Sequence, residues 1–403
     1  MDALILSVFG LTYLGMALGR VPGLKVDRTG IALMGVVVLL ATGRVPVETI
    51  GRAIDLPTLL LLFALMIVSS QFQAAGFYGW VAGRITSATG SPRRLLLLTV
   101  VAAAGLSAVL ANDIVCFAMA PILAEGARRR GLDPRPFLIG LAGAANAGSA
   151  MTVIGNPQNI LIGQSGGLDF WRFVVVCGPP GLVATGLVFA VVAWRWRAVL
   201  DAPAAASPAS PPPAPDRWQT AKGLLAVVAL AALFATSLPR EIGALVIAAS
   251  LLASRRLGSR EMIGAVDWHL LLLFACLFVV TESFAGTGLA AGAAQGIEPG
   301  RLGVMAPLML AASNTIGNVP AVMLLLSVWP APSETALHAL AVLSTLAGNL
   351  LLVGSLANII VAERAATAGV VLTFRDHAAS GIPMTLASMA VAVGWFLALG
   401  MAW

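Results

Sequence analysis

Two long apolar stretches of this chain are each interrupted by a short run rich in glycine and asparagine. Residues 154–162 read IGNPQNILI in the first half, and residues 353–361 read VGSLANIIV in the second half. Backbone that leaves a helix inside a lipid bilayer must be satisfied by protein, water or a ligand. Such interruptions at matching places in two halves of a chain indicate a solute site near the membrane midplane. The pattern therefore predicts a transport protein.

Composition favours a protein that is embedded in a membrane. Of 403 residues, 59% are apolar and only 10% are charged, and the mean hydropathy is +0.94. These values lie far outside those of soluble domains. The net charge of +6 does not indicate nucleic-acid binding, because the basic residues fall between apolar runs and so report orientation in the membrane. The three cysteines and three histidines show no metal-ligand spacing.

The apolar runs predict an all-α polytopic protein with about ten spanning helices. We expect these at 3–19, 29–43, 57–83, 136–163, 171–194, 221–237, 241–254, 268–290, 336–362 and 381–402. Two further apolar regions, at about 94–127 and 302–330, each carry a polar tip, Ala111-Asn112-Asp113 and Ser313-Asn314-Thr315. The spans at 136–163 and 336–362 contain the interruptions and are predicted to be discontinuous helices. The N-terminus begins directly with an apolar run and is interpreted as a first spanning helix.

The order of these features repeats, which predicts two copies of one unit. Residues 55–64 read DLPTLLLLFA and residues 267–275 read DWHLLLLFA, and each is followed by a tip region and then by an interruption. The predicted units are 1–200 and 218–403. Between them, residues 201–217 are rich in proline, alanine and serine and are interpreted as a disordered or extended cytoplasmic linker.

Basic residues predict the topology. Arginines lie on both sides of the region 94–127, so a single crossing would place one basic cluster outside, against the positive-inside bias. A re-entrant hairpin places both clusters in the cytoplasm, and we expect the same shape, on the outer side, for 302–330. Five full spans per half then invert the second copy relative to the first and place both termini in the periplasm. Four arginines depart from the bias and fall outside: Arg44, Arg52, Arg172 and Arg240.

Two carboxylates fall within the predicted hydrocarbon region, Asp113 at the first tip and Glu282 within the span 268–290. An ionisable group at this depth costs several kcal/mol on insertion scales and so marks a functional site by default. Both are candidates for coupling transport to an ion. For Asp113 the structural alternative is an N-cap on the second hairpin helix. Glu282 could instead be a hydrogen-bonded acid that faces the bundle interior.

Polar residues gather at the two tips and the two interruptions. Their amides, hydroxyls and freed carbonyls can coordinate a cation, and helix N-termini can face an anion. The alternative is that they serve helix packing and interhelical hydrogen bonds. Asn159 and Asn358 are the strongest candidates, and Asn146 and Gln158 are weaker. The predicted solute and ion site comprises Asn112, Asp113, Asn146, Ser149, Thr152, Gly155, Asn156, Asn159, Ser313, Asn314, Thr315, Asn318, Asn349, Gly354, Ser355 and Asn358.

Several function classes are disfavoured. The sequence contains no GxSxG, HExxH, phosphate loop or histidine cluster, so we expect neither an enzyme nor ATP hydrolysis by the chain itself. No lysine or arginine lies at the predicted midplane, so a multiply charged anion would depend on helix dipoles and a co-bound cation. A neutral or weakly charged solute has no such need.

A polar tip, a broken helix with GNPQN or GSLAN, and an inverted second copy resemble the ion transporter superfamily. That group includes arsenite/antimonite permeases, citrate-type transporters and divalent anion:sodium symporters. In the divalent-anion symporters both tips typically read Ser-Asn-Thr, and the tip together with the interruption binds sodium and a carboxylate. Residues 313–315 fit that pattern, whereas residues 111–113 depart from it. Asn112-Asp113 with Ala120-Pro121-Ile122, and Asn318-Val319-Pro320, look more like the arsenite-permease branch.

The resemblance implies an elevator-like motion and a homodimer, with a bound sodium ion, if present, near Asn112, Asn159, Asn314 and Asn358. The leading hypothesis is a secondary transporter of a bacterial cytoplasmic membrane. Its solute would be a small inorganic oxyanion or the neutral acid, arsenite or antimonite by preference, coupled to protons or sodium through Asp113. The alternatives are a sodium-coupled di- or tricarboxylate carrier, a sodium/proton exchanger, a channel and a membrane-embedded scaffold.

Overall fold

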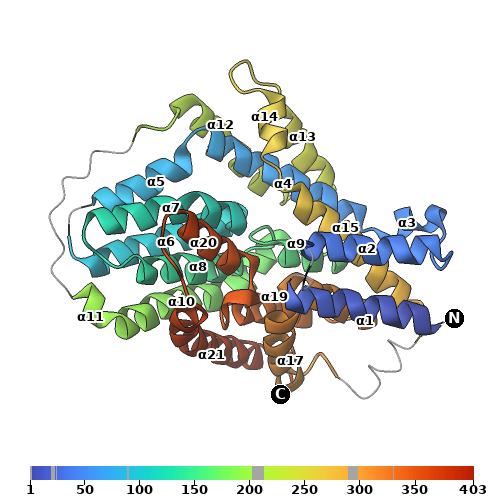
Figure 1. Ribbon diagram of the computed structural model, residues 1–403. Coiled ribbons are helices and arrows are strands. Elements are labelled where there is room, and N and C mark those ends of the chain that lie inside the picture. Colours follow the sequence, from blue (N-terminus) through green and yellow to red (C-terminus); the bar gives the residue numbers. More distant parts are fainter. Residues whose placement is uncertain are drawn as a thin grey trace.

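Helices are the only regular secondary structure in the described part of the chain. The computed structural model describes residues 2–19, 23, 25–88, 90–201, 213–288, 298–329 and 331–403, and no strand occurs among them. Figure 1 shows the helices in chain order. Five described helices are at least 18 residues long and apolar enough to cross a membrane, and five shorter apolar helices accompany them. This arrangement confirms the predicted all-α polytopic class.

Caps at the helix starts set many of the boundaries. Asp27, Asp169 and Asp216 accept backbone N–H bonds at the starts of α2, α10 and α12, as expected for Asp at N-cap positions. The helices of the first half are α1 Asp2–Leu18, α2 Arg28–Ala41, α3 Val47–Ala53, α4 Leu56–Ala74, α5 Phe77–Ser87, α6 Pro92–Val109, α7 Asn112–Arg129, α8 Arg135–Ser149, α9 Pro157–Ser165, α10 Phe170–Arg195 and α11 Arg197–Leu200. Those of the second half are α12 Arg217–Leu233, α13 Arg240–Leu252, α14 Ser259–Gly264, α15 Trp268–Ala285, α17 Leu302–Thr315, α18 Asn318–Val328, α19 Glu334–Ala347, the 3₁₀ turn η1 Leu352–Gly354, α20 Leu356–Thr367 and α21 Phe374–Ala398.

One predicted span is divided in the structure. The expected helix 57–83 is two helices, α4 and α5, separated at Ala75 and Gly76. Gly76 has φ +72°, a left-handed conformation that glycine adopts at little cost. The Ala75 carbonyl, which has left the helix, accepts a bond from the backbone N–H of Asp216 at 3.0 Å. The start of the second half therefore caps the end of α4.

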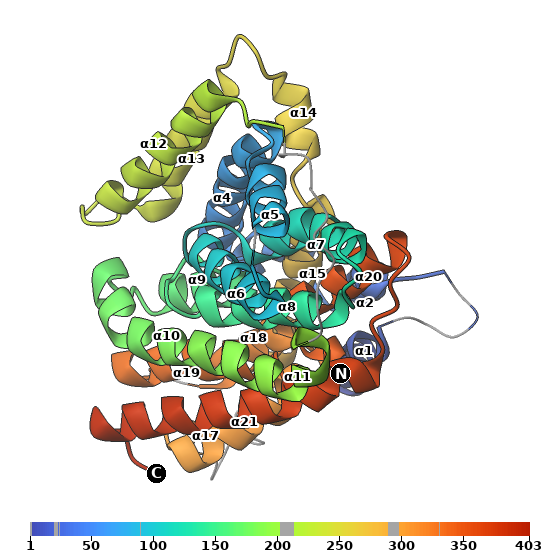
Figure 2. The same ribbon diagram turned by 90° about the vertical axis from the view of Figure 1, so that its left-hand side faces the viewer.

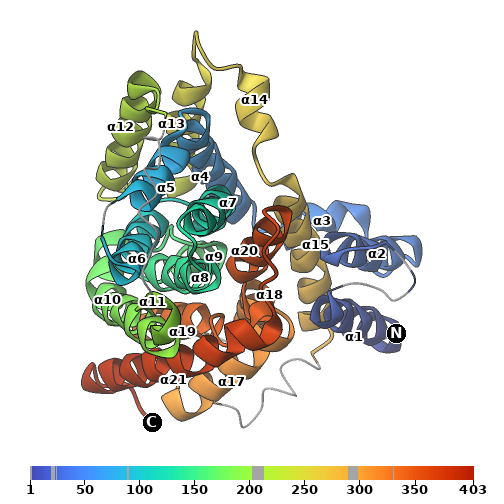
Figure 3. The same ribbon diagram turned by 60° about the vertical axis from the view of Figure 1, so that its left-hand side comes forward.

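The two halves exchange partners. The pair α1 and α2 packs against α15 of the second half, while α12 and α13 pack against α4 of the first half. Figures 1 and 3 show α1 and α2 beside α15, and α12 and α13 beside α4. The helices α4 and α15 begin in the same way: Asp55 and Asp267 are their N-caps, with nearly equal backbone angles. This pairing supports the predicted duplication, and the inversion of one copy remains a prediction.

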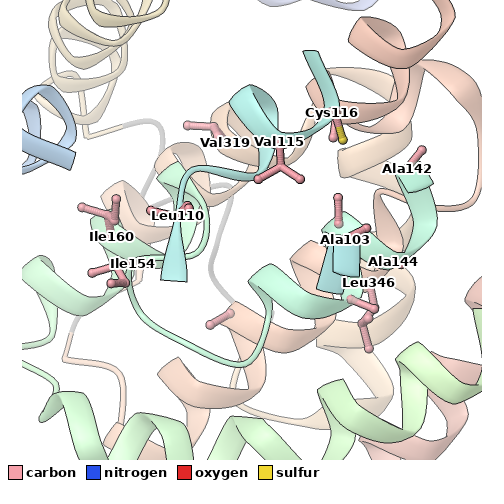
Figure 4. Packing of buried hydrophobic residues seen from close by; sticks show 14 of the residues in the cluster. Ala103, Leu110, Val115, Cys116, Ala142, Ala144, Ile154, Ile160, Val319 and Leu346 are labelled. Carbon is pink, nitrogen blue, oxygen red and sulfur yellow. The ribbon is translucent and has the colours of Figure 1, made fainter. Parts of the chain in front are cut away.

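The interrupted helices lie at the centre of a group of elements that also contains the two hairpins, α10 and α21. This set is called the interruption group below. Figure 2 shows α10, α19 and α21 side by side below α8 and α9. The first hairpin, α6 and α7, packs on α8, and the second, α17 and α18, packs on α19. Figure 4 labels buried side chains from both halves in this core, among them Leu110, Val115, Ile160, Val319 and Leu346. One continuous apolar core thus surrounds the two interruptions.

The first hairpin turns at the start of its predicted polar tip, and the second turns just after its tip. In the first, α6 ends at Val109 and α7 begins at Asn112, so Asn112 and Asp113 already lie in a helical turn. In the second, α17 continues through Thr315, and the turn is at Ile316 and Gly317. Gly317 has φ +95°, which explains why the chain reverses there rather than at the preceding polar triplet.

Residues 202–212 of the predicted linker and residues 289–290 of the span 268–290 lie outside the described residues. At the near end of the linker, Asp201 forms an ion pair of 2.7 Å with Arg93 at the start of α6. At the far end, residues 213–216 are non-helical and α12 begins at Arg217, the last residue of the predicted linker. The division into units 1–200 and 218–403 remains a prediction.

Candidate functional site

Each interruption ends one helix and starts the next with a polar cap. In the first half, Asn156 accepts a bond from the backbone N–H of Asn159 at 2.9 Å and so caps α9. In the second half, Ser355 accepts from the backbone N–H of Ala357 at 3.3 Å and so caps α20. The two caps differ by 199 residues in the numbering, and the same offset relates several pairs of contacts described below.

Asn159 and Asn358 hold the two interruptions in the same way. Asn159 Nδ2 donates to the carbonyls of Ser149 and Thr152, both at 3.0 Å. Asn358 Nδ2 donates to the carbonyls of Gly348 and Leu351, at 2.8 and 3.1 Å. Both side chains are completely buried. The carbonyls released at the end of the first half-helix are therefore bonded by the amide of the second, as buried backbone groups require.

Gly155 and Gly354 allow this close approach. A Cβ at Gly155 would lie 2.4 Å from the Ser149 carbonyl oxygen, and one at Gly354 would lie 2.3 Å from Asn314 Oδ1. Any larger residue at either position would therefore push the interruption away from its neighbours.

The two interruptions are bonded to each other across the halves. Asn146 Nδ2 lies 3.3 Å from Asn358 Oδ1, and Thr345 Oγ1 lies 3.3 Å from Asn159 Oδ1. Ser355 Oγ donates to Asn146 Oδ1 at 3.0 Å, and Asn156 Nδ2 donates to Thr345 Oγ1 at 3.2 Å. Each bond has its counterpart at the 199-residue offset. The predicted Asn, Ser and Gly residues of the two interruptions thus meet in one buried network.

A second group of bonds joins this network to α8, α19 and α21. Asn146 Nδ2 also donates to Asn349 Oδ1 at 2.7 Å, and Asn349 Nδ2 donates to the Gly143 carbonyl at 3.1 Å. The Asn349 carbonyl lies 3.1 Å from Nε2 of His377, which is fully buried on α21. Gln158 Nε2 donates to Thr345 Oγ1 at 3.2 Å.

Both hairpin turns dock on the interruptions. In the first, Thr152 Oγ1 donates to the Ala108 carbonyl at 2.6 Å, and the Asn112 backbone N–H donates to Gly155 at 3.4 Å. In the second, Asn314 Oδ1 accepts from the Leu351 backbone N–H at 3.1 Å, and its Nδ2 donates to Ala347 at 2.8 Å. Thr152 and Leu351 occupy equivalent positions at the 199-residue offset. In the first copy the interruption supplies the bonding side chain, Thr152, whereas in the second copy the hairpin supplies it, Asn314.

Further contacts hold three of the predicted residues at the tips. Asn112 Nδ2 donates to Asn146 Oδ1 at 3.3 Å, and Ser313 Oγ lies 3.4 Å from the Ser344 carbonyl. Asn318 is buried at the start of α18. Thr315, by contrast, is exposed and donates to Ala311 of its own helix, so the structure does not bring it into the network.

Asp113 is not a helix cap. The N-cap position of α7 is Ala111, and it has no side-chain cap bond. Asp113 lies in the first turn of α7, only partly exposed, and among the described residues its carboxylate has no hydrogen bond or ion pair. The structural alternative predicted for this residue is therefore wrong. Its carboxylate faces open space instead.

That space consists of two cavities that meet at Asp113. The first, of about 320 Å³, lies between α4, α7 and α9 and also reaches Asn156. The second, of about 550 Å³, lies between α20 and the ends of α1, α2 and α15. Both are lined by Asp113, Asp267, Leu270 and Ile360. Asp113 and Asp267 therefore line both cavities, from a hairpin and from the start of α15 respectively.

The charge of this region is negative. Apart from Asp113 and Asp267, the residues that line the first cavity are uncharged, and no lysine or arginine is among them. The second cavity adds Asp27, Arg28 and Glu363. Arg28 Nε donates to the Met16 carbonyl at 3.1 Å. The region thus offers carboxylates, amides and apolar surface to a solute, and little fixed positive charge.

The four amides expected near sodium do not fit a sodium site in this conformation. Sodium needs several free oxygen atoms, but Asn159 Oδ1, Asn314 Oδ1 and Asn358 Oδ1 each lie within hydrogen-bond distance of a donor. Of the four, only Asn112 Oδ1 is buried without a partner. In this conformation the four amides therefore do not form a sodium site.

Glu282 lies apart from the network. It is exposed on the last turn of α15 and lines neither of the two cavities at Asp113. The structure therefore does not bring this second coupling candidate to the site.

Three residues of the site were not predicted from the sequence. Thr345 occupies the position equivalent to Asn146, and the 199-residue offset between IGNPQNILI and VGSLANIIV would have found it. Asp267 begins the repeated segment 267–275, whose sequence indicates duplication but not a cavity residue. His377 is a single histidine in an apolar helix, and no local pattern distinguishes it.

Comparison with known proteins identifies the family. The profile of the citrate transporter family, CitMHS, matches residues 13–336. The rice silicon efflux transporter LSI3 is 28% identical over 96% of this chain and 95% of that protein. The inner membrane protein YbiR of Escherichia coli is 32% identical over 76% of this chain and 79% of that protein.

The fold of the whole chain also has a solved counterpart. The YdaH transporter of Alcanivorax borkumensis superposes with a TM-score of 0.54 over 99% of this chain and 96% of that chain, at 15% identity. A putative transporter of Dictyostelium discoideum, arsB, is 28% identical over 34% of this chain. These comparisons confirm the predicted ion transporter superfamily. The chain belongs to the citrate transporter family and is a multi-pass membrane transport protein.

Proposed function

We propose that this protein is a secondary active transporter that moves a small inorganic oxyanion as its neutral acid, of the arsenite or antimonite type, with coupling to protons through Asp113. The observation that carries the proposal is the cavity of about 320 Å³ beside Asp113 and Asn156, which lacks lysine and arginine among its lining residues.

The charge of the cavity argues for a neutral solute. A trianion or dianion in this space would meet two carboxylates, and bringing like charges into a poorly hydrated cavity costs several kcal/mol. A small polyhydroxy acid in its undissociated form brings no charge. Its hydroxyl groups can donate to the carboxylates that line the cavity. The silicon efflux named for the rice relative also concerns a small inorganic solute.

The position of Asp113 suits a coupling residue. It lies on hairpin helix α7, which belongs to the group of elements around the interruptions, whereas Asp267 begins α15, which packs with α1 and α2. If the interruption group slides past the α1–α2–α15 group, Asp113 moves away from Asp267. Proton binding to Asp113 would reduce the repulsion between the two carboxylates in the present conformation. Its release would favour the other conformation, so the proton controls the motion.

Contacts between α13 and the end of α9, on the side of the molecule away from the Asp113 cavities, support a conformation that is closed on that side. Arg240 at the start of α13 donates to the carbonyls of Gly163 and Leu168, at and beyond the end of α9. Gln164 Nε2 donates to Glu241 Oε2 at 3.2 Å. With the orientation that the arginines predict, these contacts lie on the periplasmic side of a bacterial cytoplasmic membrane. The cavities at Asp113 then open toward the cytoplasm.

A sodium-coupled citrate-type carrier is the second candidate, because the matching family is described as citrate transporters. It predicts sodium-dependent uptake of a tricarboxylate, for which the described cavities provide little positive charge. Sodium/proton exchange predicts coupled ion fluxes without a solute.

The test is transport by the full chain in proteoliposomes. Arsenite, antimonite, silicic acid and citrate are each supplied outside, with and without a pH gradient and with and without sodium. The proposal predicts counterflow of a neutral acid that responds to the pH gradient and not to sodium. Citrate counterflow that requires sodium, with no transport of the neutral acids, would overturn it. Lipid vesicles without protein serve as the control.

A further inference from the structure

A basic pocket lies apart from the solute cavities, where the end of α10 meets the starts of α8 and α21. Its volume is about 320 Å³, and its lining comprises Arg135, Arg195, Trp196, Arg375, Asp376 and Ala379. Arg195 and Arg375 come from different halves of the chain, one at the last turn of α10 and the other at the first turn of α21.

The three guanidinium groups of this pocket are not equivalent. Arg135 is neutralised by Asp133 at 2.6 Å and by Asp376 at 3.1 Å, and it lies over the Trp196 ring, 5.2 Å from the ring centroid. Arg195 and Arg375, by contrast, have neither an ion pair nor a side-chain hydrogen bond to any residue that the structure describes. The guanidinium groups of Arg195 and Arg375 thus line one cavity, and neither has a hydrogen-bond acceptor among the described residues. Guanidinium groups bind phosphate oxygens well.

The surroundings of the pocket favour a lipid over a free anion. Trp194 and Phe374, the chain neighbours of the two arginines, are 63% and 51% exposed. Exposed aromatic side chains beside arginines at the ends of spanning helices are typical of the membrane–water interface. Because α10 and α21 pack along each other and are long enough to span, acyl chains below the pocket would contact their apolar outer surface.

From this geometry we infer that the pocket binds the phosphate group of an anionic phospholipid. The phosphate bridges Arg195 and Arg375, and the acyl chains lie against α10 and α21. Basic pockets between membrane helices are known to hold such head groups. The lipid would link the two halves at the point where the Arg135–Asp376 ion pair already joins them. This inference depends on the multi-pass membrane character of the chain and not on the identity of its solute.

The experiment measures the melting temperature of the purified full chain in neutral detergent with added lipid. Cardiolipin and phosphatidylglycerol are compared with phosphatidylcholine and with inorganic phosphate. The inference predicts an upward shift of about 2–5 °C with the anionic lipids, because a ligand that binds the folded state raises its stability. Phosphatidylcholine and inorganic phosphate should each give a much smaller shift.

Variants locate the effect. The double variant Arg195→Gln/Arg375→Gln should lose the shift, and Arg195→Lys/Arg375→Lys should retain part of it. The matched control is Arg255→Gln/Arg260→Gln, two exposed arginines that do not line the pocket, and it should behave as the unaltered chain does. An equal shift in the Gln pocket variant and the control would overturn the inference. An equal shift with inorganic phosphate would overturn the assignment to a lipid.

Discussion

At the scale of single residues, the molecule uses one device twice. An asparagine in the first turn of the second half-helix bonds the carbonyls that the first half-helix releases, at Asn159 and again at Asn358. The strongest candidates for solute contact therefore have a structural duty in this conformation. The cavity that we propose for the solute instead reaches Asp113 and Asn156. A buried amide that satisfies backbone can still shape a site, because it fixes where the neighbouring cap residue points.

The donor role of Asn159 can be tested with one substitution at two positions. Asn159→Asp should destabilise the protein more than Asn156→Asp, by about 1–3 kcal/mol. In Asn159→Asp, a carboxylate replaces an amide that donates to two carbonyls. Carbonyl groups can only accept hydrogen bonds, so both bonds are lost. Asn156 donates to the hydroxyls of Ser149 and Thr345, which can rotate and donate in turn. Melting temperatures of the two variants decide the matter, and equal losses would contradict the assigned role.

The close approach at Gly155 gives a second residue-scale prediction. Gly155→Ala should lower stability by about 1–3 kcal/mol, because its Cβ would collide with the backbone of Ser149. The control is Gly105→Ala in α6, where a Cβ meets nothing within 4 Å and helix propensity improves. The melting temperature should fall in the first variant and stay level or rise in the second. A Gly155→Ala protein that melts as high as the unaltered chain would show that the approach is not required.

Sequence reasoning located most of this network and missed part of it for identifiable reasons. The glycine, serine and asparagine pattern shows where helices stop, so the two interruptions could be predicted. Thr345 could be found only by aligning the copies, because a threonine replaces the asparagine at that place. The function of Asp267 depends on what packs opposite to it, namely Asp113 across a cavity, and no local pattern contains that information.

At the scale of elements, the groups around the interruptions and around α15 must move relative to each other if the carrier proposal is right. The carrier proposal also requires the interruption group to separate from α13, which packs with α4 and α12. Arg240 on α13 joins these two parts through its contact with the carbonyls at and beyond the end of α9. Breaking the Arg240 contact should let the side of the molecule away from the Asp113 cavities open more often. Hydrogen bonds from charged donors contribute about 1.5–3 kcal/mol.

We therefore expect Arg240→Gln to increase opening on that side by about tenfold or more. The readout is the rate at which a membrane-impermeant maleimide, added outside, labels a cysteine placed at Ile160, which lines the solute cavity. Arg172→Gln is the control, since its ion pair with Glu334 is exposed at both partners and such pairs contribute little. Equal labelling rates in the two variants would exclude the contact as a closure.

Element boundaries were predictable where polar residues mark them and not elsewhere. The division between α4 and α5 escaped prediction because Gly76 stands in an apolar run, where a single glycine is also tolerated within a helix. The second hairpin reverses at Gly317 rather than at residues 313–315 for the same reason, because Gly317 also stands in an apolar region where a glycine need not end a helix. Glycine conformation is decided by the surrounding packing, and the sequence shows only that it is permitted.

At the scale of the whole molecule, the halves exchange helices: α4 packs with α12 and α13, and α15 packs with α1 and α2. Long-range pairings of this kind are absent from local periodicity, although the repeated order of segments indicated that two equivalent units exist. The exchange means that neither half has a complete cavity alone. Asp113 belongs to the first half and Asp267 to the second, and the region proposed for the solute is lined by both.

The central claim is that Asp113 binds the proton that drives transport through this shared region. The direct measurement is proton-driven uptake and counterflow of the transported acid in proteoliposomes that contain the unaltered chain, Asp113→Asn, or Glu282→Gln as the control. We predict that Asp113→Asn loses the response to a pH gradient while counterflow persists, and that Glu282→Gln keeps both, because Glu282 is exposed away from the cavities. Undiminished proton-driven uptake by Asp113→Asn would contradict the account.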